Sequence, residues 1–393
     1  MPLPYHRSVD DAWRRLRTLR HEPPEHAHRG ERRDLFSTAL EQSEQFFRAA
    51  DAVGYETKPV MLYYGVSQAA QAVLAARRDP KGQQQTATSH GTDCPNRDQI
   101  KNVGDLEIST TNARAGAFSM LAAALGSPVL AERTALRQLW VSLPEGVQLP
   151  PSGADDLFGA ALLERHDYRR YGDAFADTTG LSRVAKLAHL PHVIMPLDLA
   201  EVERRIIERY PVLRNFHVMP KPDCPEVAWW LLLLDPPRLR ASLSFDREGR
   251  PIEHAEKLGM IEMGPRAYAY PDGPSLWLPP VLSGNAAPLH PLVTWYAVLF
   301  ALSELARYRP TTWAKAININ TSADASALEH LVDAAHLACV NLIAELFDVR
   351  HPEFDKLPDG HRQHRERVLD WKRQQQTASE PPATPPGQNL GSG

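Results

Sequence analysis

The chain has 393 residues, of which 43% are hydrophobic and 23% are charged. This length allows two or three domains, or one large core with an insert, and it is sufficient to bury a core without disulfide or metal staples. With 44 Lys and Arg against 48 Asp and Glu, the formal charge of -4 excludes a strongly cationic nucleic-acid-binding chain but allows local basic patches.

Several classes of protein are excluded by the absence of their sequence signals. The strongest apolar run, 227–234, is far shorter than the roughly 18 residues that cross a bilayer, and the N-terminus has no apolar stretch typical of a secretory signal. The three cysteines, Cys94, Cys224 and Cys339, are too widely spaced for a disulfide framework or a CxxC zinc site. We therefore expect a soluble, cytoplasmic protein that makes no contact with a membrane.

The chain begins with a polar arm and continues into a helical portion. Residues 1–33 are rich in Arg, His and Pro, and within them the spacing of apolar residues predicts a short helix over 10–19. From Asp34 onward the apolar side chains follow the helical period, which predicts a long helix that Asp34 caps and Gly54 ends. We expect the helical N-terminal portion to cover residues 34–211.

The segment 58–77 is the strongest candidate for a central helix. It carries large apolar side chains and alanines on nearly all faces, which is typical of a buried helix. Pro59 suits the first helical turn, and Gly65 together with the alanines permits a neighbouring helix to approach closely.

The remaining elements of this portion are shorter. An amphipathic helix behind an Asp198 cap, ended by Pro211, is the clearest of them. In chain order we expect a polar segment with one short strand at 81–112, an apolar segment at 113–125, helices at 131–139, 154–163 and 199–210, and a run at 184–190 that fits either helix or strand.

Between residues 212 and 285 the period of the sequence changes. Short extended runs alternate with turns rich in Asp, Pro and Gly, which predicts a small antiparallel sheet. The runs lie at 216–219, 228–234, 241–245, 259–263, 267–270 and 275–278.

The C-terminal part returns to the helical period and then becomes polar. Two strongly apolar helices are expected at 292–308 and 323–347, within a helical portion that covers 286–356. The tail, 357–393, has too little apolar surface to order itself. The whole pattern predicts an α+β fold in which mainly helical N- and C-terminal portions share one core and a small antiparallel β insert separates them.

Several segments together resemble the YaaC-like family of bacterial proteins. They are Met61-Leu-Tyr-Tyr-Gly-Val-Ser-Gln-Ala-Ala-Gln-Ala-Val-Leu, Ser89-His90-Gly91, Gly116-Ala-Phe and Leu302-Ser-Glu-Leu-Ala-Arg-Tyr-Arg-Pro-Thr-Thr-Trp313. The resemblance covers the chain from about Leu35 to Phe347. It carries expectations about the fold, and it carries no established activity.

The N-terminal helix pair is also similar to the helical HEPN class, some of whose members are ribonucleases or toxin components. Active members of that class carry an Arg followed after four to six residues by a His. Five such matches occur here, about four would arise by chance, and none lies on the helices that carry the resemblance. The nuclease signature is therefore absent from its expected place.

Two polar groups are candidates for catalysis or binding. His90 is either a titratable group facing a cleft or a loop histidine whose ring satisfies backbone groups. Arg307, Tyr308 and Arg309, with Trp313, form either a clamp for phosphate or carboxylate with a Trp or Tyr stacking ring, or a helix end that cations and an aromatic residue stabilise.

Tyr64 and Gln68 share one face of the central helix and either line a pocket or belong to the core. The spacing of His330, His336 and Cys339 does not favour a metal site. The common nucleotide-binding, hydrolase and zinc-protease motifs are also absent, so we expect neither a metal nor a cofactor.

These observations favour a binding or interaction component of a bacterial defence or toxin-type system. Its expected partner is another protein, a second copy of the chain, or RNA. The alternatives are a metal-independent, HEPN-like ribonuclease that uses His90 and Arg307, and a small-molecule sensor. The sequence does not decide whether the protein is an enzyme.

Overall fold

The computed structural model describes residues 8–78, 87, 89–112, 115–165, 184–191, 198–214, 216–220, 228–233, 268–269 and 276–347. By its internal contacts the chain divides into two units, 1–349 and 350–393, and every described residue belongs to the first. The expected strands at 241–245 and 259–263 and the tail at 357–393 lie outside the described residues.

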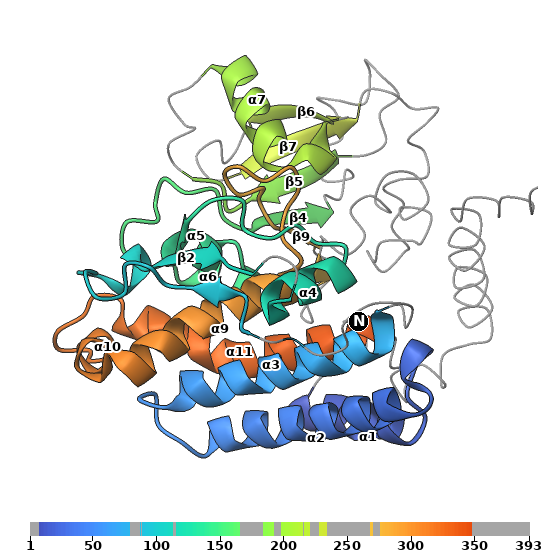
Figure 1. Ribbon diagram of the computed structural model, residues 1–393. Coiled ribbons are helices and arrows are strands. Elements are labelled where there is room, and N and C mark those ends of the chain that lie inside the picture. Colours follow the sequence, from blue (N-terminus) through green and yellow to red (C-terminus); the bar gives the residue numbers. More distant parts are fainter. Residues whose placement is uncertain are drawn as a thin grey trace, which may run out of the picture. The chain divides into compact units, whose positions relative to one another are not determined.

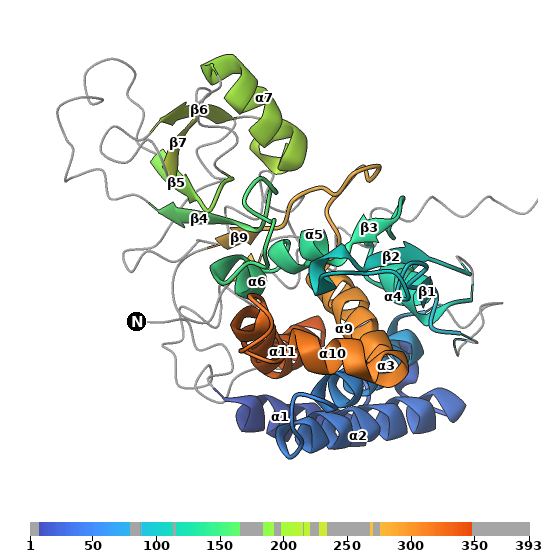
Figure 2. The same ribbon diagram turned by 90° about the vertical axis from the view of Figure 1, so that its left-hand side faces the viewer.

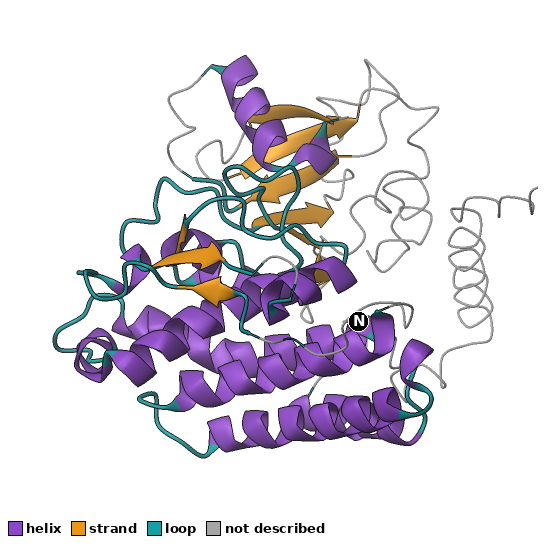
Figure 3. Ribbon diagram, in the orientation of Figure 1, coloured by secondary structure: helices purple, strands orange, loops and turns teal. Residues whose placement is uncertain are grey.

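Helices dominate the described part of the chain (Figures 1 and 3). They are α1 (Val9–His21), α2 (Glu31–Asp51), α3 (Lys58–Arg77), α4 (Ala117–Ala124), α5 (Leu136–Val141), α6 (Pro144–Gln148), α7 (Leu199–Arg209), α9 (Pro291–Tyr308), α10 (Pro310–Ala316) and α11 (Ala325–Leu346), with short 3-10 helices at Glu25–Ala27, Val103–Asp105 and Pro211–Leu213.

Helix α3 lies in the core, as its composition predicts. Its side chains from Leu62 to Ala76 are mostly shielded from solvent, because α2, α4, α9 and α11 all pack against it. Gly65 provides the close approach to α2: a Cβ atom there would lie 2.9 Å from the Phe47 ring. The Ser43 hydroxyl donates a hydrogen bond of 2.8 Å to the Gly65 carbonyl at the same place.

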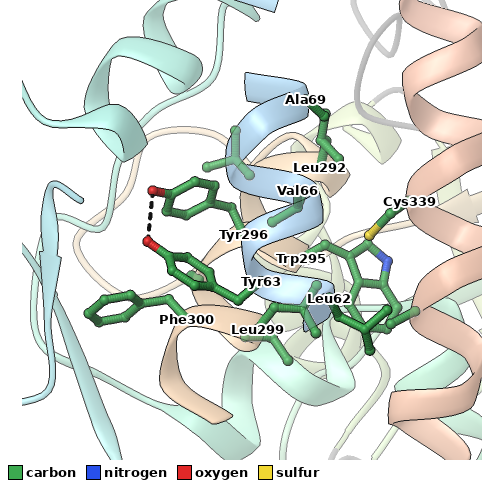
Figure 4. Packing of buried hydrophobic residues seen from close by; sticks show 14 of the residues in the cluster. Leu62, Tyr63, Val66, Ala69, Leu292, Trp295, Tyr296, Leu299, Phe300 and Cys339 are labelled. Carbon is green, nitrogen blue, oxygen red and sulfur yellow. Dashed lines mark hydrogen bonds between the residues drawn. The ribbon is translucent and has the colours of Figure 1, made fainter. Parts of the chain in front are cut away.

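The two ends of the described chain share this core. Figures 1 and 2 show α9, from the C-terminal part, beside α3, and the close-up in Figure 4 shows Leu299 and Trp295 of α9 among Leu62 and Val66 of α3. All four side chains are fully buried. The predicted α+β fold with a shared helical core is therefore confirmed.

Helix α1 fixes part of the N-terminal arm to the helical layer. Trp13 and Leu16 are buried, and the Glu44 carboxylate of α2 forms ion pairs with Arg17 of α1 and Arg48 of α2. Two arginines thus compensate for the burial of one carboxylate. Burial alone would raise the pKa of Glu44, but the hydrogen bonds and charges of the two arginines together lower it.

Strands form two antiparallel sheets in the described residues (Figure 3). The smaller sheet has the order β1-β2-β3 and the larger one β6-β7-β5-β4-β9-β8. The strands are β1 (Thr92–Asp93), β2 (Glu107–Thr110), β3 (Thr134–Ala135), β4 (Ala161–Arg165), β5 (Val184–Ala188), β6 (Phe216–Pro220), β7 (Ala228–Leu233), β8 (Tyr268–Ala269) and β9 (Leu276–Leu278).

Several local expectations need correction. The helix predicted over 154–163 is wrong, because β4 begins at Ala161 and no helix precedes it from 149 onward. The ambiguous run at 184–190 contains strand β5, so the larger sheet includes strands from before residue 212. Helix α2 begins at Glu31, which places Asp34 in the first turn and leaves Gly30 as the N-cap.

Helix α11 is long and apolar enough to cross a membrane by length and composition. However, 61% of its most apolar stretch is buried inside the protein, and a helix in the core of a folded protein passes the same test. It is therefore only weak evidence for a membrane span.

Candidate functional site

The site is built around the ring of His90, which follows the polar segment after α3. Its Nδ1 atom lies 2.5 Å from the hydroxyl of Tyr63, and that hydroxyl lies 3.2 Å from the hydroxyl of Tyr296. The Tyr296 hydroxyl in turn donates to the backbone carbonyl of His90 over 3.3 Å. Figure 4 shows the two tyrosine hydroxyls, from α3 and α9, pointing toward each other.

Two glycines allow the chain to place His90 there. Gly91 has a φ of +79°, a conformation that glycine adopts readily, and a Cβ atom on Gly116 would lie 2.3 Å from the Gly91 Cα. Because the two backbones cross so closely, the amides at the start of α4 reach the loop: Phe118 donates to the His90 carbonyl over 3.0 Å.

The environment of the three rings sets their protonation. Burial raises the pKa of Tyr63, and it raises the pKa of Tyr296 to about 12. Burial also lowers the pKa of His90, with a further lowering by the Arg307 cation and an opposing effect of the Glu304 anion. Both tyrosines are therefore neutral at pH 7, and the neutral form of His90 is favoured.

Arg307 also lies near the Tyr63 ring. Its guanidinium is 6.0 Å from the centre of that ring, whereas the His90 ring is 5.5 Å from it. The guanidinium donates to Glu304 over 2.6 Å and to the Tyr64 hydroxyl over 3.3 Å. The structure therefore brings the two predicted catalytic candidates, His90 and Arg307, to one aromatic side chain.

A second arginine shares the same carboxylate. Arg97 forms an ion pair with Glu304, whose side chain is only 7% exposed. Both guanidinium groups also lie against the ring of Tyr308, Arg97 at 4.9 Å and Arg307 at 5.0 Å from its centre. Tyr308 itself is 56% exposed. One anion thus faces two cations beside an exposed ring, which leaves a surplus positive charge. We call His90, Tyr63, Tyr296, Glu304, Arg307, Arg97 and Tyr308 the His90–Arg307 site.

The other predicted binding residues lie in different places. The Tyr64 hydroxyl contacts Arg307, and its ring stacks on Phe46. Arg309 pairs with Asp98 over 2.8 Å close to the site. Trp313 is 1% exposed and donates to the Tyr55 carbonyl, so its ring packs in the core. Gln68 is half-buried, and within the described residues no interaction joins it to His90 or Arg307.

Several members of the site were not singled out as site residues from the sequence. Glu304 stands three residues before Arg307 on a helix, a spacing at which opposite charges meet, so this pair had a detectable signal. Arg97 and Tyr296 gave no such signal in the sequence, because about 200 residues or more separate each of them from its partner in the site.

Metal ligation finds no support in the described residues, which contain no group of three or more His, Cys, Asp or Glu side chains able to hold an ion. His336 instead stacks on Phe47 and bonds to Asp51 over 2.9 Å. Burial raises the pKa of Cys94, next to the site, and of Cys339 in the core. Both thiols are therefore neutral at pH 7 and poor nucleophiles.

Comparison with curated proteins and with solved structures gives no match for this chain. A family model described as YaaC-like Protein matches residues 5–169 and 225–347. These two segments include the helices and the loop that build the His90–Arg307 site, and they span well over half of the chain. The chain therefore belongs to the YaaC-like protein family.

Proposed function

We propose that the protein is an RNA-binding component, and that single-stranded RNA binds at the His90–Arg307 site. The observation that carries this proposal is the arrangement of Arg97 and Arg307, which share one buried carboxylate and lie against one exposed tyrosine ring.

The charges of the site fit a phosphate group. Glu304 neutralises one of the two guanidinium groups, so the pair retains about one positive charge. Arg307 uses three of its five N–H groups on Ser303, Tyr64 and Glu304. The remaining donors suit phosphate oxygens, which guanidinium binds through charge-assisted hydrogen bonds.

The exposed ring of Tyr308 fits a nucleobase. A base that stacks on a protein aromatic ring contributes about 1–3 kcal/mol, and neighbouring arginines add to the attraction. A free phosphate or carboxylate ligand would leave this ring unused, which is why we favour RNA over a small anion. We place this function in the cytoplasm, within a bacterial defence or toxin-type system of the kind known from HEPN modules.

The test is the affinity for a single-stranded RNA oligonucleotide, measured by fluorescence anisotropy at several salt concentrations. Tyr308→Ala removes the stacking face from the surface and should weaken binding about tenfold. Arg97→Gln should weaken binding and reduce the salt dependence by roughly the 0.7 expected for one phosphate contact.

Arg204→Gln is the matched control, because Arg204 is an exposed arginine on α7 that pairs only with Glu201 and Glu208 among the described residues. It should bind RNA like the wild type. Absence of RNA binding, or equal affinity of Tyr308→Ala and wild type, would contradict the proposal.

A second candidate function, metal-independent RNA cleavage, is favoured by the state of His90. His90 is an exposed residue, although its ring is partly shielded by Tyr63 and Phe300, and within the described residues no hydrogen bond reaches Nε2. A neutral imidazole beside a cation can take a proton from a hydroxyl near neutral pH.

Cleavage of labelled RNA in the presence of EDTA tests this candidate. His90→Gln should lower the rate by about 100-fold or more, the usual contribution of a general base. His28→Gln, a change of an exposed histidine in the N-terminal region, should leave the rate unchanged. Intact RNA after incubation with wild type would exclude cleavage and leave the binding function.

A further inference from the structure

We infer that Tyr63 and Tyr296 are positioning residues that hold His90 in the form protonated on Nδ1, so that Nε2 accepts a hydrogen bond from the ribose 2′-hydroxyl of RNA. This inference rests on the proposed function and deepens it, because it states how the site distinguishes RNA from DNA.

His90, Tyr63 and Tyr296 form a closed ring of contacts whose protons can be counted. The ring runs from His90 Nδ1 to the Tyr63 hydroxyl, on to the Tyr296 hydroxyl, and back to the His90 carbonyl. Each of these three contacts needs one proton, and each tyrosine hydroxyl brings only one. The third proton must therefore come from His90 Nδ1.

The direction of the hydrogen bonds follows from the last acceptor. A carbonyl oxygen cannot donate, so Tyr296 must donate to the His90 carbonyl. Tyr63 then donates to the Tyr296 oxygen, and His90 Nδ1–H donates to the Tyr63 oxygen. In the opposite tautomer Tyr63 would donate to Nδ1, and one of the two remaining contacts would contain no proton.

The surroundings keep the ring of contacts in place. Tyr63 and Tyr296 are fully buried, and Phe300 packs edge-on against Tyr63 at 5.5 Å between ring centres. The His90 carbonyl also accepts the amide of Phe118, which prevents the loop from turning its backbone away. Solvent does not reach either tyrosine. The Ser67 side chain also hydrogen-bonds to the Tyr296 hydroxyl and lowers its pKa, the effect of a donor, so Tyr296 keeps its own proton for the His90 carbonyl.

The consequence for recognition is that Nε2 carries a lone pair and no proton. It can bind only a group that donates, and the 2′-hydroxyl is the donor that RNA has and DNA lacks. Arg307, whose guanidinium lies 6.0 Å from the centre of the Tyr63 ring, would hold a phosphate of the same strand. A 2′-O-methyl group has no proton to donate, so it separates the effect of the donor from that of the sugar conformation.

The tautomer can be measured on the full chain without any ligand. In a nitrogen-15 correlation spectrum recorded above the pKa of His90, wild type should show a protonated Nδ1 and an unprotonated Nε2. Tyr63→Phe and Tyr296→Phe each remove one oxygen, and both should shift His90 toward the Nε2–H form. Tyr308→Phe, outside the ring of contacts, should leave the pattern unchanged. An Nε2–H signal in wild type would overturn the inference.

Binding of three oligonucleotides of one sequence then tests recognition. Wild type should bind RNA about fivefold more tightly than the DNA or 2′-O-methyl form, as one hydrogen bond provides. In Tyr63→Phe and Tyr296→Phe this preference should disappear while binding to all three persists. Equal affinity of wild type for the three would overturn the inference and leave the proposed function, whereas failure to bind any of them would overturn both.

Discussion

Glu304 and Arg307 act on His90 with opposite sign, although they form an ion pair with each other. Burial lowers the pKa of His90 first, Arg307 lowers it further, and Glu304 raises it. The tyrosines that face the ring stay neutral throughout the range in which histidine titrates. The charge state of His90 therefore depends first on burial and then on the balance of this one pair.

The two members of the pair should shift the titration of His90 in opposite directions. Arg307→Gln removes a cation and should raise the pKa of His90, whereas Glu304→Gln removes an anion and should lower it. Nuclear magnetic resonance titration of the His90 ring protons measures both shifts. Shifts of equal sign would mean that rearrangement of the loop, and not charge, sets the pKa.

The sequence identified His90, Arg307 and Tyr308 as candidates but not the connection between them. His90 and Arg307 stood out as polar residues beside apolar segments, and both lie in the site. The ring of contacts with Tyr63 and Tyr296 could not be predicted, because it depends on how α3 and α9 are aligned. Trp313 was selected with them for its stacking ring, but only the structure shows that it is buried.

At the scale of single elements, the loop that holds His90 depends on the close crossing of two glycines. Gly116→Ala would place a Cβ atom 2.3 Å from the backbone of Gly91, so the loop must move. We expect this variant to be destabilised by about 1–3 kcal/mol and to lose the His90–Tyr63 hydrogen bond. Chemical denaturation and the nitrogen-15 signal of His90 measure the two effects.

Gly54→Ala is the matched control for this change. A Cβ atom there meets only the end of the Glu56 side chain, which can move aside, and Gly54 needs no left-handed backbone. Its stability should stay within about 0.5 kcal/mol of wild type. A stable Gly116→Ala variant with an intact His90 signal would show that the loop keeps its structure when the Gly91 and Gly116 backbones move apart.

Helix α9 begins with a buried histidine that acts as its N-cap. The Nδ1 atom of His290 accepts the amide of Leu292 over 3.1 Å, which requires an unprotonated nitrogen. Burial lowers the pKa of His290 to about 3, with a smaller contribution from Arg77. In the unfolded chain the group titrates near its ordinary value of 6.5.

This pKa difference predicts how acid affects stability. Between pH 6.5 and about 3 the unfolded chain binds a proton that the folded chain does not, so the free energy of unfolding should fall as the pH is lowered. His290→Asn keeps a capping acceptor without the titration and should show a shallower decrease. His290→Ala should lose about 1 kcal/mol at neutral pH. Parallel pH profiles for wild type and His290→Asn would contradict this assignment.

The sequence predicted helices better than strands, for a physical reason. A segment such as 58–77 is long enough for its period to show, and α3 has the predicted bounds. The run that begins at Ala161 is rich in Ala and Leu and only five residues long, so its period could not distinguish a strand from a helix. The run is a strand because it pairs with β5 and β9 in the sheet, and neither of these is a neighbour in the sequence.

At the scale of the whole molecule, the packing of α3 against α9 joins the two ends of the described chain into one core. Leu299→Ala removes a fully buried side chain from this contact and should cost about 2–5 kcal/mol. Hydrogen exchange should show that amides of α3 and α9 lose protection at the same urea concentration. Leu337→Ala, at a position on α11 that is 40% exposed, should have little effect. Protection of α3 that outlasts that of α9 would indicate separate folding units.

The shared core was predictable because the segment 58–77 is apolar on nearly all faces and the segment 292–308 is strongly apolar, and such helices bury their surfaces against each other. The family membership follows from segments on both ends, which agrees with this arrangement.

The last acceptor in the ring of contacts at His90 is the carbonyl of His90 itself. The imidazole therefore cannot rotate about its own side-chain bonds without breaking contacts that end on its own main chain. Its rotational freedom is lost when the protein folds and not when a ligand arrives. The entropy lost on binding at this site should therefore come mainly from ordering the ligand, because the His90 side chain is already ordered in the free protein.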